Sequence, residues 1–130
     1  MSKILIVANS SEDRSILGLV LEFGGHCCEL ASNLQEATNL LQKASFDLVI
    51  ADCRRGTAIH TLARRLRVAS PKTNVVFLSG TPERNRQEVD ELLLSPCSPH
   101  DLLDSIQNVL QRKPPGAVRH TRMATREVRA

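Results

Sequence analysis

Asp52 is the residue of this chain that is best placed to do chemistry. It closes an apolar run at residues 46–51, which is typical of a buried strand. A carboxylate at the carboxyl end of a strand faces the crevice in which open α/β sheets bind their ligands. Because desolvating a carboxylate without a purpose is costly, this position favours a functional role for Asp52.

Polar residues follow the other apolar runs and should meet Asp52 at the same edge of the sheet. Asn9 comes after the first run, Ser79 and Gly80 end the fourth, and Ser95 follows the fifth. The carboxyl ends of parallel strands lie along one edge, so side chains just past them converge. The sequence therefore predicts an oxygen-rich pocket of one carboxylate, one amide and two hydroxyls.

The elements that hold these residues follow from the spacing of the apolar side chains. Short apolar runs predict five strands, at residues 3–8, 26–30, 47–51, 74–78 and 91–94. Helical spacing predicts four helices, around residues 16–23, 34–41, 59–66 and 99–111. Strands that alternate with helices in this way favour a parallel sheet with helices on both faces.

Residues typical of helix ends support these boundaries. Ser10 precedes Asp13 by three positions, and Ser98 precedes Asp101 by three, so both pairs resemble capping boxes at the start of a helix. The pair at 24–25 is Gly-Gly, which can enter the left-handed conformation that ends many helices. We therefore expect the first helix to run between Ser10 and this glycine pair.

The composition limits the class of protein. A chain of 130 residues suffices for one domain with a single core. Aromatic residues make up only 2%, without Trp or Tyr, which argues against a protein that stacks single-stranded nucleic acid on aromatic rings. The four Cys lack the paired spacing of metal or redox sites, the four His are scattered, and neither a signal peptide nor a membrane-length apolar segment is recognisable. We expect reduced thiols in a cytoplasmic protein.

The end of the chain differs from the rest in charge. Residues 112–130 hold 6 of the 17 Lys and Arg but only 1 of the 14 Asp and Glu, and they lack apolar periodicity. We therefore divide the chain into a folded domain at 1–112 and a basic, disordered tail at 113–130. Charge alone could attract the tail to nucleic acid or lipid, but no base-reading motif accompanies the arginines, and neither partner is expected.

Four segments resemble the receiver domain of bacterial two-component response regulators. Residues 3–14 (KILIVANSSEDR) look like the opening strand and loop of that family, and 46–52 (FDLVIAD) like the strand that ends in its phosphorylated aspartate. Residues 75–80 (VVFLSG) look like the strand that ends in its switch hydroxyl, and 95–102 (SPCSPHDL) resemble the segment that a Lys-Pro pair opens. The resemblance spans residues 3 to about 111, nearly the whole predicted domain.

The resemblance implies roles for the residues of the predicted pocket. It makes Asp52 the phosphoacceptor and Ser79 the hydroxyl that moves onto the phosphoryl group, with Gly80 and Ser95 beside it. The donor would be a histidine kinase or a phosphotransfer protein, and an unknown downstream protein would bind the phosphorylated domain. It further implies a receiver that works through protein contacts rather than as an enzyme.

The resemblance also implies a Mg²⁺ site, but with fewer charges than the family uses. Its ligands would be Asp52, Asn9 and the backbone carbonyl of Arg54. The family's acidic pair is replaced by Ala8 and Asn9, so one protein charge remains and binding should be weak. Arg54 and the arginine after it could balance the charge of Asp52 instead, or simply face solvent as most arginines do.

Further positions depart from the family pattern. The lysine of the last loop is Ser95, and the switch aromatic of the fifth strand is Leu92. Only fifteen residues separate Ser79 from Ser95, so the fourth helix of the family pattern should be short, at about residues 83–89. We expect signalling through a redesigned version of that face or through another surface.

Three functions are compatible with these observations. The first is a single-domain receiver in two-component phosphorelay signalling. The second is a pseudo-receiver that binds partners without phosphorylation, and the missing acidic pair and lysine favour it as a mechanism. The third, a flavin or nucleotide binder, lacks a glycine-rich phosphate loop after the first strand. All three share the predicted fold class, α/β with a flavodoxin-like doubly wound five-stranded parallel sheet in the order 2-1-3-4-5.

Overall fold

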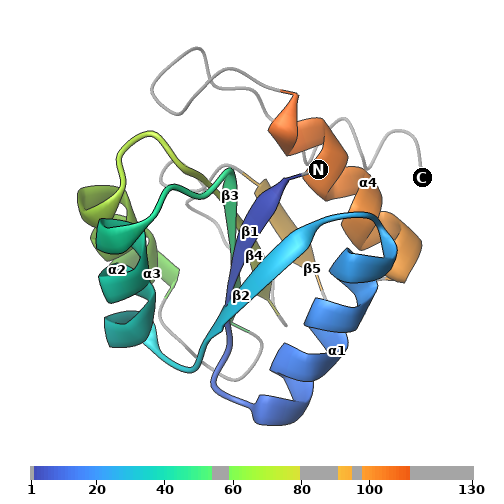
Figure 1. Cartoon of the computed structure of the whole chain (residues 1–130), viewed down its shortest axis with the longest axis horizontal. Helices are drawn as coiled ribbons and strands as arrows, with labels where there is room; N and C mark the ends of the chain where they lie inside the picture. Colours follow the sequence, from blue (N-terminus) through green and yellow to red (C-terminus); the bar gives the residue numbers. More distant parts are fainter. Residues whose placement is uncertain (1, 54–58, 80–90, 95–97, 112–130) are drawn as a thin grey trace.

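The computed structural model describes residues 2–53, 59–79, 91–94 and 98–111 (Figure 1). The elements are β1 Lys3–Val7, α1 Ser11–Phe23, β2 Cys27–Ala31, α2 Leu34–Lys43, β3 Leu48–Cys53, α3 Ile59–Ala69, β4 Asn74–Ser79, β5 Glu91–Leu94 and α4 Pro99–Leu110. The predicted short helix at 83–89 and the predicted tail at 113–130 lie outside these ranges. No helix within them is long and apolar enough to cross a membrane.

The strands form a parallel sheet with helices on both faces. The order β2-β1-β3-β4 confirms the predicted one, and β5 pairs parallel with β4, with Val76 opposite Glu91. Figure 1 shows α2 and α3 together on one side of the sheet and α1 and α4 on the other. This is the doubly wound α/β architecture, in which the helix that follows β1 and the helix that follows β3 lie on opposite faces of the sheet.

Alternating side chains of the central strands fill two cores, one on each face of the sheet. On the face of α2 and α3, Val49, Ala51 and Phe77 pack with the apolar side of those helices. On the face of α1 and α4, Ile4 and Ile50 pack with theirs. Every residue of β3 and β4 is buried, as expected of central strands in a parallel sheet covered on both sides.

Helix α1 buries fewer of its apolar residues than its spacing predicted. Leu17 and Leu21 are buried, but Ile16 is 52% exposed and Phe23 is 91% exposed. Ile16 and Phe23 belong to the same apolar spacing as Leu17 and Leu21, but they do not face the core. Because α1 packs mainly against β2, at the edge of the sheet, only a narrow line of its surface meets other parts of the domain.

The predicted helix ends are confirmed. Ser10 Oγ accepts a hydrogen bond from the N–H of Asp13 at 3.3 Å, and Ser98 Oγ accepts one from the N–H of Asp101 at 3.0 Å. Gly25 has a φ of +91°, in the left-handed region that favours glycine. These ends fix where α1 begins and ends, and hence how closely its first turn follows β1.

The adjacent cysteines of β2 face different environments, as expected from the alternation of side chains along a strand. Cys27 is exposed, whereas Cys28 is partly buried beside α1. Burial, followed by the nearby charges of Glu22 and Cys27, raises the pKa of the Cys28 thiol to about 11. Cys28 is therefore an unreactive thiol at neutral pH.

Candidate functional site

Asp52 lies near the carboxyl end of β3, between β1 and β4. The strand continues one residue past it, to Cys53, so Asp52 is part of the sheet rather than of the loop that follows. In the register it is opposite Leu78 of β4, and its neighbour Ala51 is opposite Val7 of β1. Only 9% of Asp52 is exposed. The sheet thus holds a carboxylate, nearly buried, at the edge where ligands of such folds bind.

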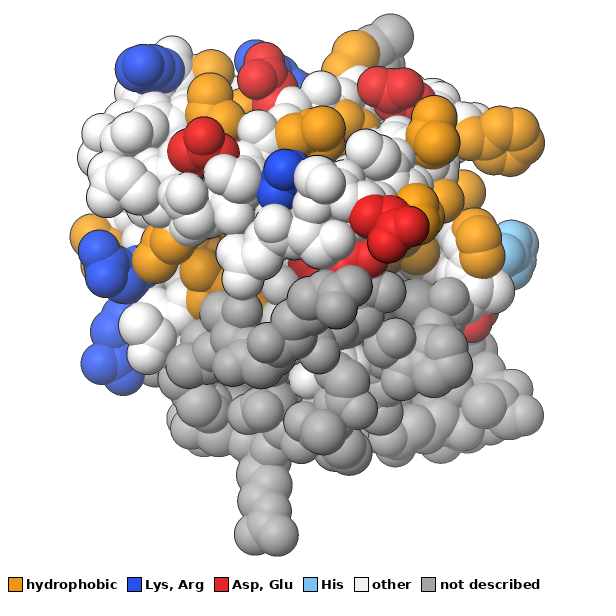
Figure 2. Space-filling view, turned by 90° about the horizontal axis from the view of Figure 1, so that it is seen from below, with side chains coloured by type: hydrophobic (Ala, Val, Ile, Leu, Met, Phe, Trp, Pro, Cys, Tyr) orange, Lys and Arg blue, Asp and Glu red, His pale blue; other side chains and the backbone are white. Residues whose placement is uncertain are grey.

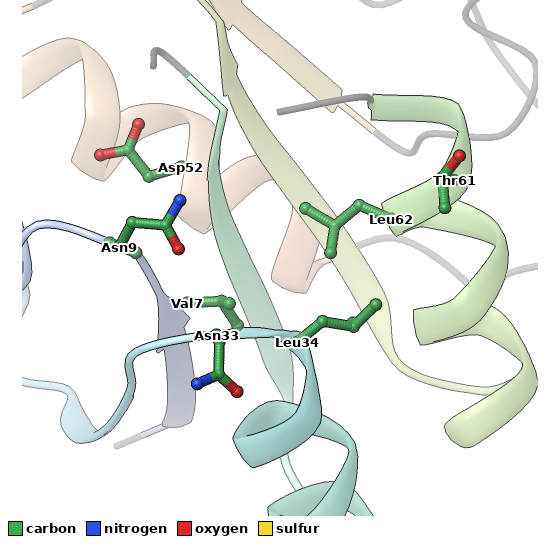
Figure 3. A pocket seen from close by; sticks show the side chains of 8 residues that line it. Val7, Asn9, Asn33, Leu34, Asp52, Thr61 and Leu62 are labelled. Carbon is green, nitrogen blue, oxygen red and sulfur yellow. The ribbon is translucent and has the colours of Figure 1, made fainter. Parts of the chain in front are cut away.

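A cavity of about 220 Å³ opens beside this carboxylate (Figure 3). Figure 3 shows the side chains of Asp52 and Asn9 next to each other, with Leu34 and Leu62 reaching the cavity from α2 and α3. The residues that line it are Val7, Ala8, Asn9, Asn33, Leu34, Asp52, Thr61 and Leu62. The predicted meeting of Asn9 with Asp52 therefore occurs, and the cavity adds apolar walls from two helices that the sequence interpretation did not include.

The loop between β1 and α1 is held in place by Arg14. Its Nη1 donates to the carbonyl oxygen of Ala8 at 2.7 Å and to that of Asn9 at 3.1 Å. These two bonds use main-chain carbonyl oxygens of the loop, and the side chain of Asn9 lies next to Asp52 (Figure 3). Ala8 is 2% exposed and has no oxygen on its side chain. The position that carries an acid in the family pattern therefore offers no ligand.

A second carboxylate, missed by the sequence interpretation, borders the same site. Asp13, in the first turn of α1, lines a narrow hollow, too small to hold a water molecule, together with Asn9, Ser10 and Asp52. In the sequence its spacing from Ser10 indicated only a helix cap. The sequence feature that could have indicated this position of Asp13 is the short loop after β1. A helix that begins so soon after β1 has its first turn at the edge of the sheet where β3 ends.

These donors fit Mg²⁺, the metal that the family pattern implies. The side chains of Asp52, Asp13 and Asn9 all offer oxygen, the ligand atom that Mg²⁺ prefers, and such sites commonly use one or two carboxylates with water for the rest. Within the described ranges there is no group of three or more His, Cys, Asp and Glu that could hold a metal. The three side chains therefore have the ligand chemistry of a hard cation such as Mg²⁺.

Ser79 lies beside the site but not directly opposite Asp52. It is the last residue of β4, is 3% exposed, and pairs with Cys53. Along β4 it alternates with Val75 and Phe77, which places it toward the face of α2 and α3. Neither of the two hollows described above has Ser79 in its described lining. The other predicted members of the pocket, at positions 54, 80 and 95, lie outside the described residues.

The start of α2, which contributes Asn33 to the cavity, is fixed by reciprocal hydrogen bonds. Asn33 Oδ1 accepts from the N–H of Glu36 at 2.9 Å, while Glu36 Oε1 accepts from the N–H and the hydroxyl of Ser32 at 2.6 and 2.7 Å. The bond from the Ser32 N–H, then the one from its hydroxyl, lower the pKa of the Glu36 carboxyl, with a smaller effect from Arg14. This turn positions the cavity wall formed by α2.

We expect Ser32→Ala to raise the pKa of Glu36 part of the way toward its ordinary value of 4.5, because it removes the hydroxyl donor and leaves the N–H. A carboxyl whose pKa is lowered by folding stabilises the fold above its unfolded pKa and loses that effect as pH falls through the folded one. An NMR titration of the Glu36 side chain measures the shift, with the exposed Ser15→Ala as control. An unchanged titration in Ser32→Ala would contradict the assignment.

The chain is similar to known response regulators in sequence and in structure. No family model matches it. It is 30% identical to the phosphate regulon transcriptional regulatory protein PhoB of Pseudomonas aeruginosa, in an alignment of 122 residues that covers 87% of this chain and 53% of that protein. The chain thus spans about half the length of this curated relative.

Solved structures of the same fold belong to this class of protein. The Vibrio cholerae chemotaxis protein CheY4 superposes with a TM-score of 0.74 at 26% identity, covering 84% of this chain and 98% of that one. A Thermotoga maritima response regulator, solved in complex with Mg²⁺–BeF, gives a TM-score of 0.74 at 21% identity and covers 84% and 99%. The order of the sheet and the carboxylate at the end of β3 agree with these likenesses. The described part of the chain is thus a receiver-like domain, similar in fold and sequence to those of response regulators.

Proposed function

We propose that this receiver works in a two-component phosphorelay and accepts a phosphoryl group on Asp52 from a histidine kinase or a phosphotransfer protein. The observation that carries the proposal is the carboxylate of Asp52, nine-tenths buried at the carboxyl edge of the sheet and open to a cavity beside Asn9. A buried carboxylate costs free energy that a merely structural position would not require. Its place at this edge is the one where doubly wound sheets act on ligands.

The transfer needs little covalent chemistry from the protein. A carboxylate oxygen of Asp52 forms a bond to phosphorus, while the bond from phosphorus to the histidine nitrogen of the donor breaks and its electrons stay with that nitrogen. The difficulty is electrostatic, because an anionic oxygen approaches an anionic phosphoryl group. Mg²⁺ would neutralise this charge when bound, and the Thermotoga maritima response regulator solved with Mg²⁺–BeF supports a metal here. Asn9 would position the ion or its water.

The output of the domain, in this proposal, is a change in protein contacts rather than turnover of a substrate. Ser79 would move onto the phosphoryl group and shift the domain between two conformations. The described surface can support protein contacts, because Ile16, Leu19 and Phe23 form an exposed apolar line along α1. Figure 2, seen from the edge where the strands end, shows apolar, acidic and basic side chains mixed over the described part of that face.

A pseudo-receiver that binds partners without phosphorylation is the second candidate. It is favoured by the replacement of the acidic pair by Ala8 and Asn9, which leaves an uncharged side chain and an amide after β1. The flavin or nucleotide binder is less favoured, because the cavity of about 220 Å³ is smaller than the roughly 300–1,000 Å³ of most small-molecule sites. Phosphorylation of Asp52 separates the first two candidates.

The test incubates the full chain with a small-molecule phosphodonor, with and without Mg²⁺, and follows its intact mass. We expect an adduct of one phosphoryl group that forms only with Mg²⁺ and maps to the peptide containing Asp52. Beryllofluoride with Mg²⁺ should shift amide resonances around Asp52 and Ser79 in the same sample. Failure to form either adduct at saturating Mg²⁺ would leave the pseudo-receiver as the function of the domain.

A further inference from the structure

The outward side of α1 carries three exposed apolar side chains, Ile16, Leu19 and Phe23, which we call the apolar line. Leu19 is 69% exposed, and Phe23 is almost fully so. Their spacing of three and four residues places them on one side of the helix, turned away from the buried Leu17 and Leu21. Three large apolar side chains in succession exceed the single exposed ones that are usual on a surface, and they indicate a contact with another segment.

Acidic side chains surround the apolar line. Glu12 lies one turn before it and Glu22 lies beside its end, and both are exposed. Asp101 and Asp104 are exposed on α4, which packs against α1. Arg14 is the one Lys or Arg in these two helices, and its Nη1 is bonded to carbonyl oxygens of the loop after β1. An acidic surface with an apolar centre fits a basic segment that also carries apolar residues.

The chain itself continues into a basic segment close to this surface. The tail at 113–130 follows α4, which lies beside α1 with Leu103 against Gly24 (Figure 1). Figure 1 shows the two helices running in the same direction, so α4 ends on the side where α1 ends. A flexible chain of 18 residues spans about 23 Å, and the 13 residues of α1 extend over about 20 Å. The tail is therefore long enough to run back along the whole of α1.

The composition of the tail complements that of α1. It contains five Lys or Arg against one Glu, and Val118, Met123 and Val128 recur among the arginines at intervals of five residues. Because the tail is tethered beside α1, its effective concentration there is on the order of millimolar. A second copy of the chain would have to reach that concentration in solution to compete. Tethering thus favours the chain's own tail as the segment that covers the apolar line.

We propose that the basic tail binds α1 of its own chain, with its arginines near Glu12 and Glu22 and its apolar residues over the apolar line. This contact shields the exposed apolar surface of α1. A protein partner that binds the same surface must displace the tail, so the tail limits access to α1. The contact does not depend on phosphorylation of Asp52, and it therefore goes beyond the proposed phosphoryl-acceptor function.

The first test is limited digestion of the full chain with trypsin, followed by intact mass. We expect Leu19→Ser to speed cleavage after Arg119 and Arg122 by at least about threefold, because cleavage follows the population in which the tail is released. The matched control is Val68→Ser, which removes an apolar side chain that is 78% exposed on α3, on the other face of the sheet. A thermal melt checks that both variants are folded.

The second test removes charge from the tail in the full chain. We expect Arg122→Gln combined with Arg126→Gln to shift the amide resonances of residues 12–23, because it weakens the attraction to the acids of α1. The control combines Arg65→Gln with Lys72→Gln, which removes the same charge from exposed positions in and just after α3. The control should leave the resonances of α1 unchanged.

Faster cleavage in Leu19→Ser but not in Val68→Ser, with shifts of α1 that are the same at every protein concentration, supports the proposal. Equal cleavage of the wild type and Leu19→Ser overturns it, as does an unchanged α1 spectrum when the two tail arginines are replaced. Shifts of α1 that grow with protein concentration would assign the surface to a second copy of the chain, and they would also overturn the contact within one chain.

Discussion

Asp52→Asn is expected to abolish the Mg²⁺-dependent phosphoryl adduct completely. The amide nitrogen and oxygen that replace the carboxylate cannot form the acyl phosphate, and the substitution removes the charge around which the metal ligands gather. Because Asn is close to Asp in shape, the packing between β1 and β4 should survive. Intact mass after treatment with phosphodonor and Mg²⁺ measures the loss, and circular dichroism checks that the variant is folded.

The control for this substitution is Asp47→Asn, just before β3. Asp47 is exposed, and its Oδ2 accepts a hydrogen bond from the N–H of Lys3 at 2.8 Å, at the edge of the sheet opposite to the pocket. The Asp47→Asn variant loses the same charge at the opposite end of β3, and it should form the adduct like the wild type. An adduct that persists in Asp52→Asn and maps to another residue would contradict the assignment of the acceptor.

The sheet could be predicted from sequence because its signal is strong. β1, β3 and β4 are continuous apolar runs, as strands buried on both faces must be, and the helical segments between them leave a parallel arrangement as the simplest packing. The position of Asp52 followed directly, since a carboxylate that closes such a run must come to the carboxyl edge. Asn9 followed in the same way from the end of β1.

The faces of the helices were harder to predict, because they depend on where each helix lies over the sheet. Ile16 and Phe23 have the spacing of core residues, yet they are exposed because α1 covers the edge of the sheet. Asp13 was assigned to a helix cap for a related reason. Its hydrogen-bonded neighbour Ser10 is visible in the sequence, whereas its approach to Asp52 depends on the loop length and on the face that β3 presents to α1.

The pairing of Ser79 shows a further limit of sequence interpretation. The sequence places Asp52 and Ser79 at the ends of neighbouring strands, but it does not give the register between them. In the structure Ser79 is opposite Cys53, so Ser79 and Asp52 differ by one position and alternate toward different faces. Movement of Ser79 onto a phosphoryl group on Asp52 would therefore require a shift at the end of β4, as expected of a conformational switch.

The core beneath the site should dominate the stability of the domain. We expect Phe77→Ala to lower the free energy of unfolding by about 3–5 kcal/mol, because it removes a large, fully buried side chain and leaves a cavity. Phe77 pairs with Ala51 and lies two residues before Ser79, so the loss of packing also destabilises the strands that hold the pocket. Urea unfolding followed by circular dichroism measures the change as a shift of the midpoint.

The same substitution at Phe23 provides the control. Phe23 is 91% exposed at the end of α1, so Phe23→Ala should change the free energy of unfolding by less than about 0.5 kcal/mol. Alanine also has the higher helix propensity, which opposes any small loss of contact. Similar losses for Phe77→Ala and Phe23→Ala would contradict the arrangement of α1 at the sheet edge. A large difference would agree with a Phe23 side chain that makes few contacts within the domain and a Phe77 side chain in its core.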